Sequence, residues 1–232
     1  MYLLKPIFLT TFLCILFKII IAQGIHQGVE KVYGMDPDLY NGQIYDYFVQ
    51  VNSRGNQFLS RPEFTEGSVR IKGVTYTDLL LNYDVFNQQL LLKGHNALYS
   101  NTIIALSQAW LEGFSLGPTS FEVVRFQDTS RRICQISGDS YIRILTYWTK
   151  EQKIDYYYTT PIYVFSLPEK QMYLQIGTDI IRFKNNKSFI SAFGKPLQVV
   201  ISKYMHQHKV KVRKADTAKI QALIIFCNTL PR

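Results

Sequence analysis

The sequence lacks several of the short motifs by which many enzymes are identified. Its 232 residues contain no cysteine-protease signature and no glycine-rich loop of the kind that cradles phosphate. Only four histidines are present, so few side chains are available as a general base. Pairs of Asp and Glu such as glycosidases use are brought together only by the fold, and one sequence does not reveal them. We therefore predict a protein that binds without catalysis and needs no cofactor or metal. The alternative is a hydrolase built from spatially assembled carboxylates.

The sequence also lacks an uninterrupted apolar run of about 20 residues, the length that a transmembrane helix needs. Near the N-terminus, an uncharged stretch follows Lys5 and ends at Lys18, and a short apolar stretch then leads to Ala22. A basic start, a short apolar core and a small residue at its end are typical of a secretory signal peptide. We predict that residues 1–22 are a signal peptide and that the rest of the chain is exported. The alternative is an uncleaved membrane anchor.

Cysteine is scarce as well. Beyond Cys14, which lies in the predicted signal peptide, the chain has only Cys134 and Cys227. An oxidising compartment permits one disulfide between these two, and closing so long a loop would stabilise the fold by about 4–5 kcal/mol. Each cysteine also lies in an apolar run, where it suits the role of a small buried side chain. The sequence leaves both alternatives open.

From residue 43 to about residue 183, apolar residues recur with a period of two. In one run, Leu79, Leu81, Tyr83 and Val85 share a face. Alternation of this kind in β-branched and aromatic residues is typical of half-buried strands. Short turns separate the runs and no helix-length segment intervenes, which disfavours a parallel sheet. We predict that residues 23–183 form a mainly β domain (α+β overall), an antiparallel meander of roughly ten strands that makes a sandwich, a barrel or a curved half-barrel.

The period changes after residue 183, and residues 184–232 are predicted to be a short helical segment packed on the β domain. Asn185 begins a polar stretch typical of a helix start. Pro196 suits the first turn of a second helix, and either Asp216 or Ala215 begins a third. The positions predicted to dock these helices are Leu197, Val200, Ile201 and Tyr204 on the second helix and Ile220, Leu223, Ile224 and Cys227 on the third.

The chain is basic, with or without the predicted signal peptide. The formal net charge is +9 at pH 7, and it becomes +7 when Lys5 and Lys18 leave with the signal peptide, because that segment has no acid. A basic excess favours anionic partners. We expect a lipid, an acidic glycan or an envelope protein, with peripheral contact to a membrane. Because an exported protein does not meet nucleic acid, we expect no nucleic-acid partner.

The densest run of basic residues, from residue 203 to residue 214, is the most specific candidate for a binding site. In an extended link, Val210 and Val212 would face the core while the lysines between them project to the other side. The predicted anionic-surface patch consists of Lys203, Lys209, Lys211, Arg213 and Lys214. The alternative is that these cations only keep the surface solvated.

Aromatic residues gather in the second half of the strand region. A groove lined by such rings would bind an apolar ligand or stack on a sugar. The predicted groove residues are Tyr147, Trp148, Tyr156, Tyr158 and Tyr163. The alternative is that the rings fill the concave face of the sheet and its cross-strand pairs.

Two segments of the chain carry a resemblance to a known family. They are the segment from Gly67 to Asp84 and the segment from Arg182 to Lys187, which begins the helical end. Together they resemble a family of secreted Gram-negative, Bacteroidetes-type envelope proteins of unknown function. The resemblance implies a location in the periplasm or cell envelope, and it brings no catalytic residue with it.

The leading functional hypothesis is therefore a non-catalytic periplasmic or envelope protein that binds through a curved antiparallel sheet. Its most concrete form is a carrier of lipid or lipoprotein. The alternatives are the secreted hydrolase and an interaction subunit of an envelope complex. A free sheet edge or an exposed apolar patch would mark the last of these.

Overall fold

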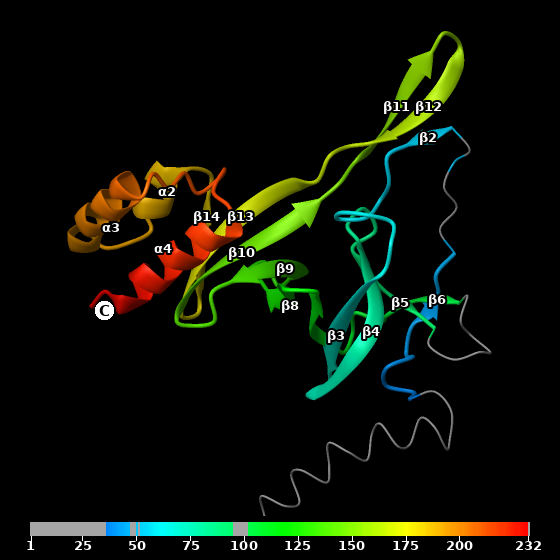
Figure 1. Ribbon diagram of the computed structural model, residues 1–232, viewed down its shortest axis with the longest axis horizontal. Coiled ribbons are helices and arrows are strands. Elements are labelled where there is room, and N and C mark those ends of the chain that lie inside the picture. The colour runs from blue at the N-terminus through cyan, green and yellow to red at the C-terminus, as the bar shows by residue number, and fades with distance from the viewer. Residues whose placement is uncertain (1–35, 47–49, 51, 95–101, 232) are drawn as a thin grey trace, which may run out of the picture. The chain divides into compact units, whose positions relative to one another are not determined.

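The computed structural model describes residues 36–46, 50, 52–94 and 102–231. The predicted signal peptide, residues 1–22, lies outside the described residues. The chain divides into two compact units, Met1–Asn41 and Gly42–Arg232, and every strand and helix named below belongs to the second. The described part of this second unit is mainly β, as predicted, with helices after the last strand (Figure 1).

Fourteen strands are present in the described residues. In chain order they are β1 (Gln43–Ile44), β2 (Ser53–Arg54), β3 (Thr65–Ile71), β4 (Val74–Asp84), β5 (Gln89–Lys93), β6 (Ile103–Ala105), β7 (Leu111–Leu116), β8 (Thr119–Arg125), β9 (Arg131–Ser137), β10 (Ile142–Thr149), β11 (Gln152–Tyr157), β12 (Thr160–Phe165), β13 (Glu169–Ile176) and β14 (Asp179–Phe183). The predicted number of roughly ten is too low. Strands β1, β2 and β6 have only two or three residues, too few to display a period of two.

Eleven of these strands form one antiparallel sheet in the order β1-β6-β5-β4-β3-β7-β8-β9-β10-β13-β14. The sheet is open rather than closed into a barrel, because β1 and β14 stand at its two edges. Most neighbours in the sheet are also neighbours in the chain, which is the predicted meander. The remaining strands form a small sheet in the order β11-β12-β2, in which β12 and β2 pair in parallel. This parallel pair departs from the prediction of a purely antiparallel fold.

Strand β4 shows the alternation that the sequence predicts. Leu79, Leu81 and Tyr83 are buried, and the Tyr83 ring packs edge-on against two phenylalanine rings of β7 and β8. The opposite face is covered too, which the sequence does not indicate. Asn82 donates hydrogen bonds to three backbone carbonyls of residues 61–63, and Asp84 accepts one from Tyr45 Oη at 2.6 Å. Because these bonds satisfy the polar groups, both can be buried.

Three helices follow the strands. They are α2 (Asn186–Ile190), α3 (Lys195–Gln207) and α4 (Thr217–Thr229). The predicted starts are confirmed: Asn185 caps α2, Pro196 lies in the first turn of α3, and Asp216 caps α4 by accepting from the Lys219 N–H at 2.8 Å.

The helices dock on one face of β10, β13 and β14. The core between them contains the strand residues Ile142, Ile144, Met172, Leu174 and Phe183 and the helical-segment residues Phe189, Phe193, Ile201, Met205, Val210, Val212, Ile220, Leu223, Ile224 and Cys227. The predicted inner face of α4 is therefore right in all four positions. On α3 the prediction fails at Val200, which is 43% exposed, while Met205 is buried in its place. Ile201 and Met205 are four residues apart and share the buried face of α3, whereas Val200 lies outside that face.

A glycine lets α4 lie close to the sheet. Gly138, in the turn between β9 and β10, has a φ of 91°, and a Cβ added to it would lie 2.6 Å from Cγ2 of Ile224. One turn further along α4, the Asn228 side chain bonds both backbone groups of Ile142, at 2.9 and 2.8 Å. These two contacts fix the helix against β10.

The two cysteines are not bonded to each other. Cys227, on α4, lies in the core between the helices and the sheet. Cys134 lies in a separate cluster on the opposite face of the sheet, with Leu145 and Tyr173. Burial raises the pKa of each thiol to about 12. Of the two alternatives that the sequence left open, the structure has the small buried side chain at both positions.

Candidate functional site

The net charge of the chain is concentrated in its helical end. Residues 184–232 contain ten Lys and Arg against a single acid, Asp216, which gives this segment a formal charge of +9. Residues 1–183 contain sixteen Lys and Arg and sixteen Asp and Glu, and so carry no net charge. We refer to residues 184–231 as the cationic module. A count of charge by segment would have found this division in the sequence, whereas the density of lysines in one stretch finds only part of it.

All nine cations of the cationic module are exposed to solvent. They are Lys184, Lys187, Lys195, Lys203, Lys209, Lys211, Arg213, Lys214 and Lys219. Within the described part of the chain, none of them forms an ion pair with a carboxylate. The five predicted patch residues all belong to this set. Elsewhere, cations such as Arg70, Arg132 and Arg143 are paired with Glu or Asp.

The link between α3 and α4 is held by two valines and one asparagine. Val210 and Val212 are buried at 3% and 0% exposure, as predicted, but the link is turned rather than extended, with Lys209 at a φ of 50° and residues 212–214 in a turn. The Asn186 side chain donates to the Val210 carbonyl at 2.8 Å and accepts from the Val212 N–H at 3.0 Å. Because this backbone is fixed from beneath, Lys209 and Lys211 are held on the solvent side of the link.

Lys209 occupies a backbone conformation in which glycine is the usual residue. It has a φ of 50° and directly follows the C-cap of α3. The Val210 N–H reaches the Met205 carbonyl at 2.8 Å, and the Lys209 N–H reaches the His206 carbonyl at 3.2 Å. These two bonds form a Schellman motif, whose left-handed position favours glycine. The chain therefore has a lysine where glycine would be more stable.

Exposed apolar side chains lie on the helices of the module. Val199 on α3 is 72% exposed and precedes Lys203 by one helical turn, while Ile225 on α4 is 66% exposed and lines a pocket between α4 and the sheet. Residues four apart on a helix lie on the same face. The surface of the module is thus a mixture of basic and aliphatic side chains.

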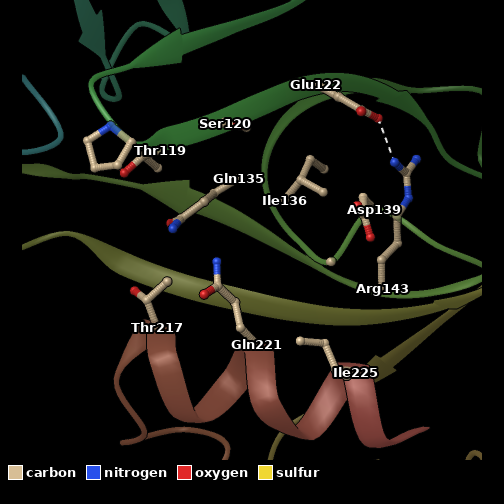
Figure 2. Close-up of a pocket in the computed structure, with 12 residues that line it drawn as sticks. Thr119, Ser120, Glu122, Gln135, Ile136, Asp139, Arg143, Thr217, Gln221 and Ile225 are labelled. Carbon is tan, nitrogen blue, oxygen red and sulfur yellow. Dashed lines mark ion pairs between the residues drawn. The ribbon is translucent and has the colours of Figure 1, made fainter. Parts of the chain in front are cut away.

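A pocket of about 490 Å³, lined by charged, amide, hydroxyl and aliphatic side chains, lies between strands β8 to β10 and helix α4 (Figure 2). Arg143 and Glu122 form an ion pair across it at 2.9 Å, and Arg143 also donates to the Gln175 side chain at 2.9 Å. Asp139 lines the same pocket, as do Gln135 and Gln221. The Glu122 carboxylate is thus already engaged, and no histidine lines this pocket.

The chain contains one Gly-x-Ser-x-Gly string, from Gly113 to Gly117, the spacing of the nucleophile elbow of serine hydrolases. That elbow is a sharp turn between a strand and a helix. Here Ser115 lies within β7, between β3 and β8, and its Oγ is 2.9 Å from Ser68 Oγ and accepts from the Ser68 N–H at 3.0 Å. The string therefore has a structural role in the sheet.

The five predicted groove aromatics are divided between two sheets. Tyr147 and Trp148 are half-buried on β10, where the Trp148 Nε1–H donates to Gln135 Oε1 at 2.8 Å. Tyr163 is half-buried on β12, whereas Tyr156 and Tyr158 are 66% and 88% exposed at the end of the β11–β12 hairpin. None of the five lines the pocket of Figure 2. The groove stays a prediction, and two of its rings are instead exposed at a hairpin.

No helix in the described part of the chain is long and apolar enough to cross a membrane. In the same residues, no group of three or more His, Cys, Asp and Glu side chains is arranged to hold a metal ion. Comparison with models of protein families, with curated proteins and with solved structures finds no match for this chain.

Proposed function

We propose that this chain is a non-catalytic binding protein of the cell envelope that attaches to an anionic lipid surface through its cationic module. The observation that carries the proposal is the separation of charge. Nine exposed cations, none of them in an ion pair among the described residues, lie on a helical segment with one acid, while residues 1–183 carry no net charge. A charge that served only solubility would have no reason to gather in one segment.

The strength expected of such a surface suits reversible attachment. Each cation held near an anionic bilayer contributes about 1 kcal/mol. If the five residues of the predicted patch face the lipid together, the sum is about 5 kcal/mol, which corresponds to a dissociation constant somewhat below 1 mM. Peripheral proteins commonly add a second contribution to reach stable attachment.

The aliphatic side chains of the module favour lipid over acidic glycan. A helix that lies in a membrane interface combines basic residues with apolar ones that enter the boundary between headgroups and acyl chains. Val199 is exposed one helical turn before Lys203 and suits that role. A glycan would offer this side chain no apolar surface. The envelope location rests on the predicted signal peptide and on the family resemblance of the sequence.

The other functional hypotheses receive less support. A carrier of lipid chains needs an apolar cavity. The pocket of Figure 2 contains the Glu122–Arg143 ion pair. A second, more apolar pocket, lined by Ile142, Ile176, Phe193 and Leu197 among others, has a volume of about 320 Å³, which is at the low end for a ligand site. A hydrolase would need Glu122 and Asp139 free to act in the pocket of Figure 2, but Arg143 already engages Glu122.

Sedimentation with vesicles tests the proposal. The purified protein should sediment with vesicles that contain anionic phospholipid and should remain in solution with purely zwitterionic ones. Replacing Lys209, Lys211 and Arg213 by Ser should weaken this binding by about two orders of magnitude, at about 1 kcal/mol for each cation. Binding of the wild type should fade as salt shortens the screening length to about 8 Å and below.

A matched control separates the position of the charges from their number. Arg54, Arg61 and Arg125 are exposed cations outside the module, and replacing these three by Ser removes the same charge. This control should bind anionic vesicles nearly as well as the wild type. If both triple variants lose the same affinity, or if neither does, the cationic module is not the binding surface.

A further inference from the structure

Strand β11 stands at the outer edge of the small sheet, and no other strand of the described residues pairs with its free side (Figure 1). Five of its six residues are exposed, including Ile154 at 56%, Tyr156 at 66% and Tyr157 at 63%. An open, partly apolar edge is a template on which another strand can pair. A strand that pairs with β11 must match its outward-facing backbone groups and its charged side chains.

The backbone groups that point outward from β11 are those of its even-numbered residues. Glu151 faces Ser166 in the register of the hairpin, and the Ser166 N–H donates to the Glu151 carbonyl at 2.8 Å. In an antiparallel ladder, alternate residues point their backbone groups toward the same neighbour. Lys153, Asp155 and Tyr157 therefore bond toward β12. Gln152, Ile154 and Tyr156 direct their N–H and C=O groups away from it.

The Tyr156 N–H agrees with this assignment. It donates to the carboxylate of the preceding Asp155 at 2.8 Å rather than to a strand. The bond occupies an outward-facing donor that the small sheet does not use. A pairing strand would offer that donor a carbonyl instead.

We propose that the chain forms a symmetric dimer in which β11 pairs antiparallel with β11 of a second copy, with Ile154 opposite Ile154 on the two-fold axis. This register places Gln152 opposite Tyr156, so the outward backbone groups of each strand meet those of the other. It also places Lys153 opposite Asp155 of the other copy, twice. The result is a continuous six-stranded sheet built from the two small sheets.

The charges of Lys153 and Asp155 favour this register over the two registers shifted by one residue. Shifting the axis by one residue in either direction puts Lys153 opposite Lys153 or Asp155 opposite Asp155. Like charges directly opposite one another destabilise a strand pair, whereas opposite charges stabilise it. Charged residues on an edge usually block pairing. Because Lys153 and Asp155 lie on either side of Ile154, the register centred on Ile154 is the one of the three in which they face each other and attract.

Two existing contacts must rearrange when the dimer forms. Lys153 Nζ lies 3.4 Å from Glu151 Oε2, and both side chains are about 70% exposed, so this ion pair is weak and easily exchanged. The Asp155 carboxylate must leave the Tyr156 N–H and move to the partner's Lys153. The ion pair of Lys153 is replaced by an ion pair with the other copy, and the hydrogen bond of the Tyr156 N–H is replaced by one to a backbone carbonyl. The ring of Tyr156 is then partly buried beside Ile154 of the other copy.

Charge reversal and its restoration test the dimer. Sedimentation equilibrium of the purified wild type should show a monomer–dimer equilibrium. Lys153→Asp and Asp155→Lys, each alone, should weaken dimerisation by about tenfold or more, because both make the facing pairs repulsive. The double variant, with the two residues exchanged, should dimerise like the wild type. Recovery in the double variant also shows that neither single change acts by unfolding the hairpin.

A second variant tests the backbone pairing itself. The Ile154 N–H points away from β12, so Ile154→Pro removes a donor of the proposed interface and none of the hairpin ladder, and edge strands tolerate such a proline. This variant should be monomeric with an unchanged circular dichroism spectrum. A wild type that is monomeric at every concentration overturns the proposal. A dimer that survives both Ile154→Pro and the single charge reversals does so too. Neither result bears on the lipid proposal, which concerns a different surface.

Discussion

Gly138 is the residue at which a single added methyl group should disturb the docking of the cationic module. An L-residue in a left-handed conformation costs about 1–2 kcal/mol, and Gly138 has a φ of 91°. The added Cβ would also lie 2.6 Å from Ile224 Cγ2, so the helix or its side chain must shift, at a further cost of about 1–3 kcal/mol. Gly138→Ala should therefore lower the free energy of unfolding by about 2–5 kcal/mol in urea denaturation.

Gly73 provides the matched control. It has a φ of 76°, in the turn between β3 and β4, but a Cβ added there meets nothing within 4 Å. Gly73→Ala should cost only the backbone contribution of about 1–2 kcal/mol. The penalty of Gly138→Ala should also shrink in an Ile224→Ala background, because the two sites touch. Equal losses for the two glycine variants, or strict additivity with Ile224→Ala, would refute the close approach of α4 to the turn.

Three further predictions concern the cationic module and the two buried cysteines. Leu223→Ala should cost about 2–4 kcal/mol of unfolding free energy, while Ile225→Ala, on the exposed side of the same helix, should cost less than about half a kcal/mol. Lys209→Gly should raise the unfolding free energy by about 1 kcal/mol and weaken vesicle binding, because it relieves the left-handed lysine but removes a cation. The stability that the buried thiols of Cys134 and Cys227 contribute should be complete below pH 9.0 and be lost as the pH rises to about 12, since the unfolded chain releases these protons first. Urea unfolding at increasing pH should show a smaller decline when both are replaced by Ala.

Local patterns were enough to predict the large sheet and the helices. The alternation at Leu79 to Val85 identifies β4 and its buried face, and the polar residues at Asn185 and Asp216 identify two helix starts. Each of these signals lies within one turn or one strand of the structure it forms. The burial of Val210 and Val212 was predicted too, although the link between α3 and α4 is turned rather than extended.

Features that depend on distant parts of the chain could not be predicted in this way. Strand β2 pairs with β12, more than a hundred residues later in the chain, and no local pattern in either strand indicates this pairing. The burial of Asp84 depends on Tyr45, and the division of the aromatic rings between two sheets depends on where the β11–β12 hairpin stands. The exposed edge of β11 is likewise a property of the assembled sheet.

The central claim is that the cationic module is the part of the molecule that touches the lipid, and a site-resolved probe tests it most directly. The two cysteines of the described residues are buried, so a cysteine placed at an exposed position can be labelled selectively with an environment-sensitive fluorophore. Ala218 on α4 and Thr75 on β4 are both exposed. With anionic vesicles, the label at Ala218→Cys should shift to the emission of an apolar environment while the label at Thr75→Cys stays unchanged. A shift at Thr75→Cys alone, or no shift at Ala218→Cys under conditions in which the protein sediments with vesicles, would contradict the account.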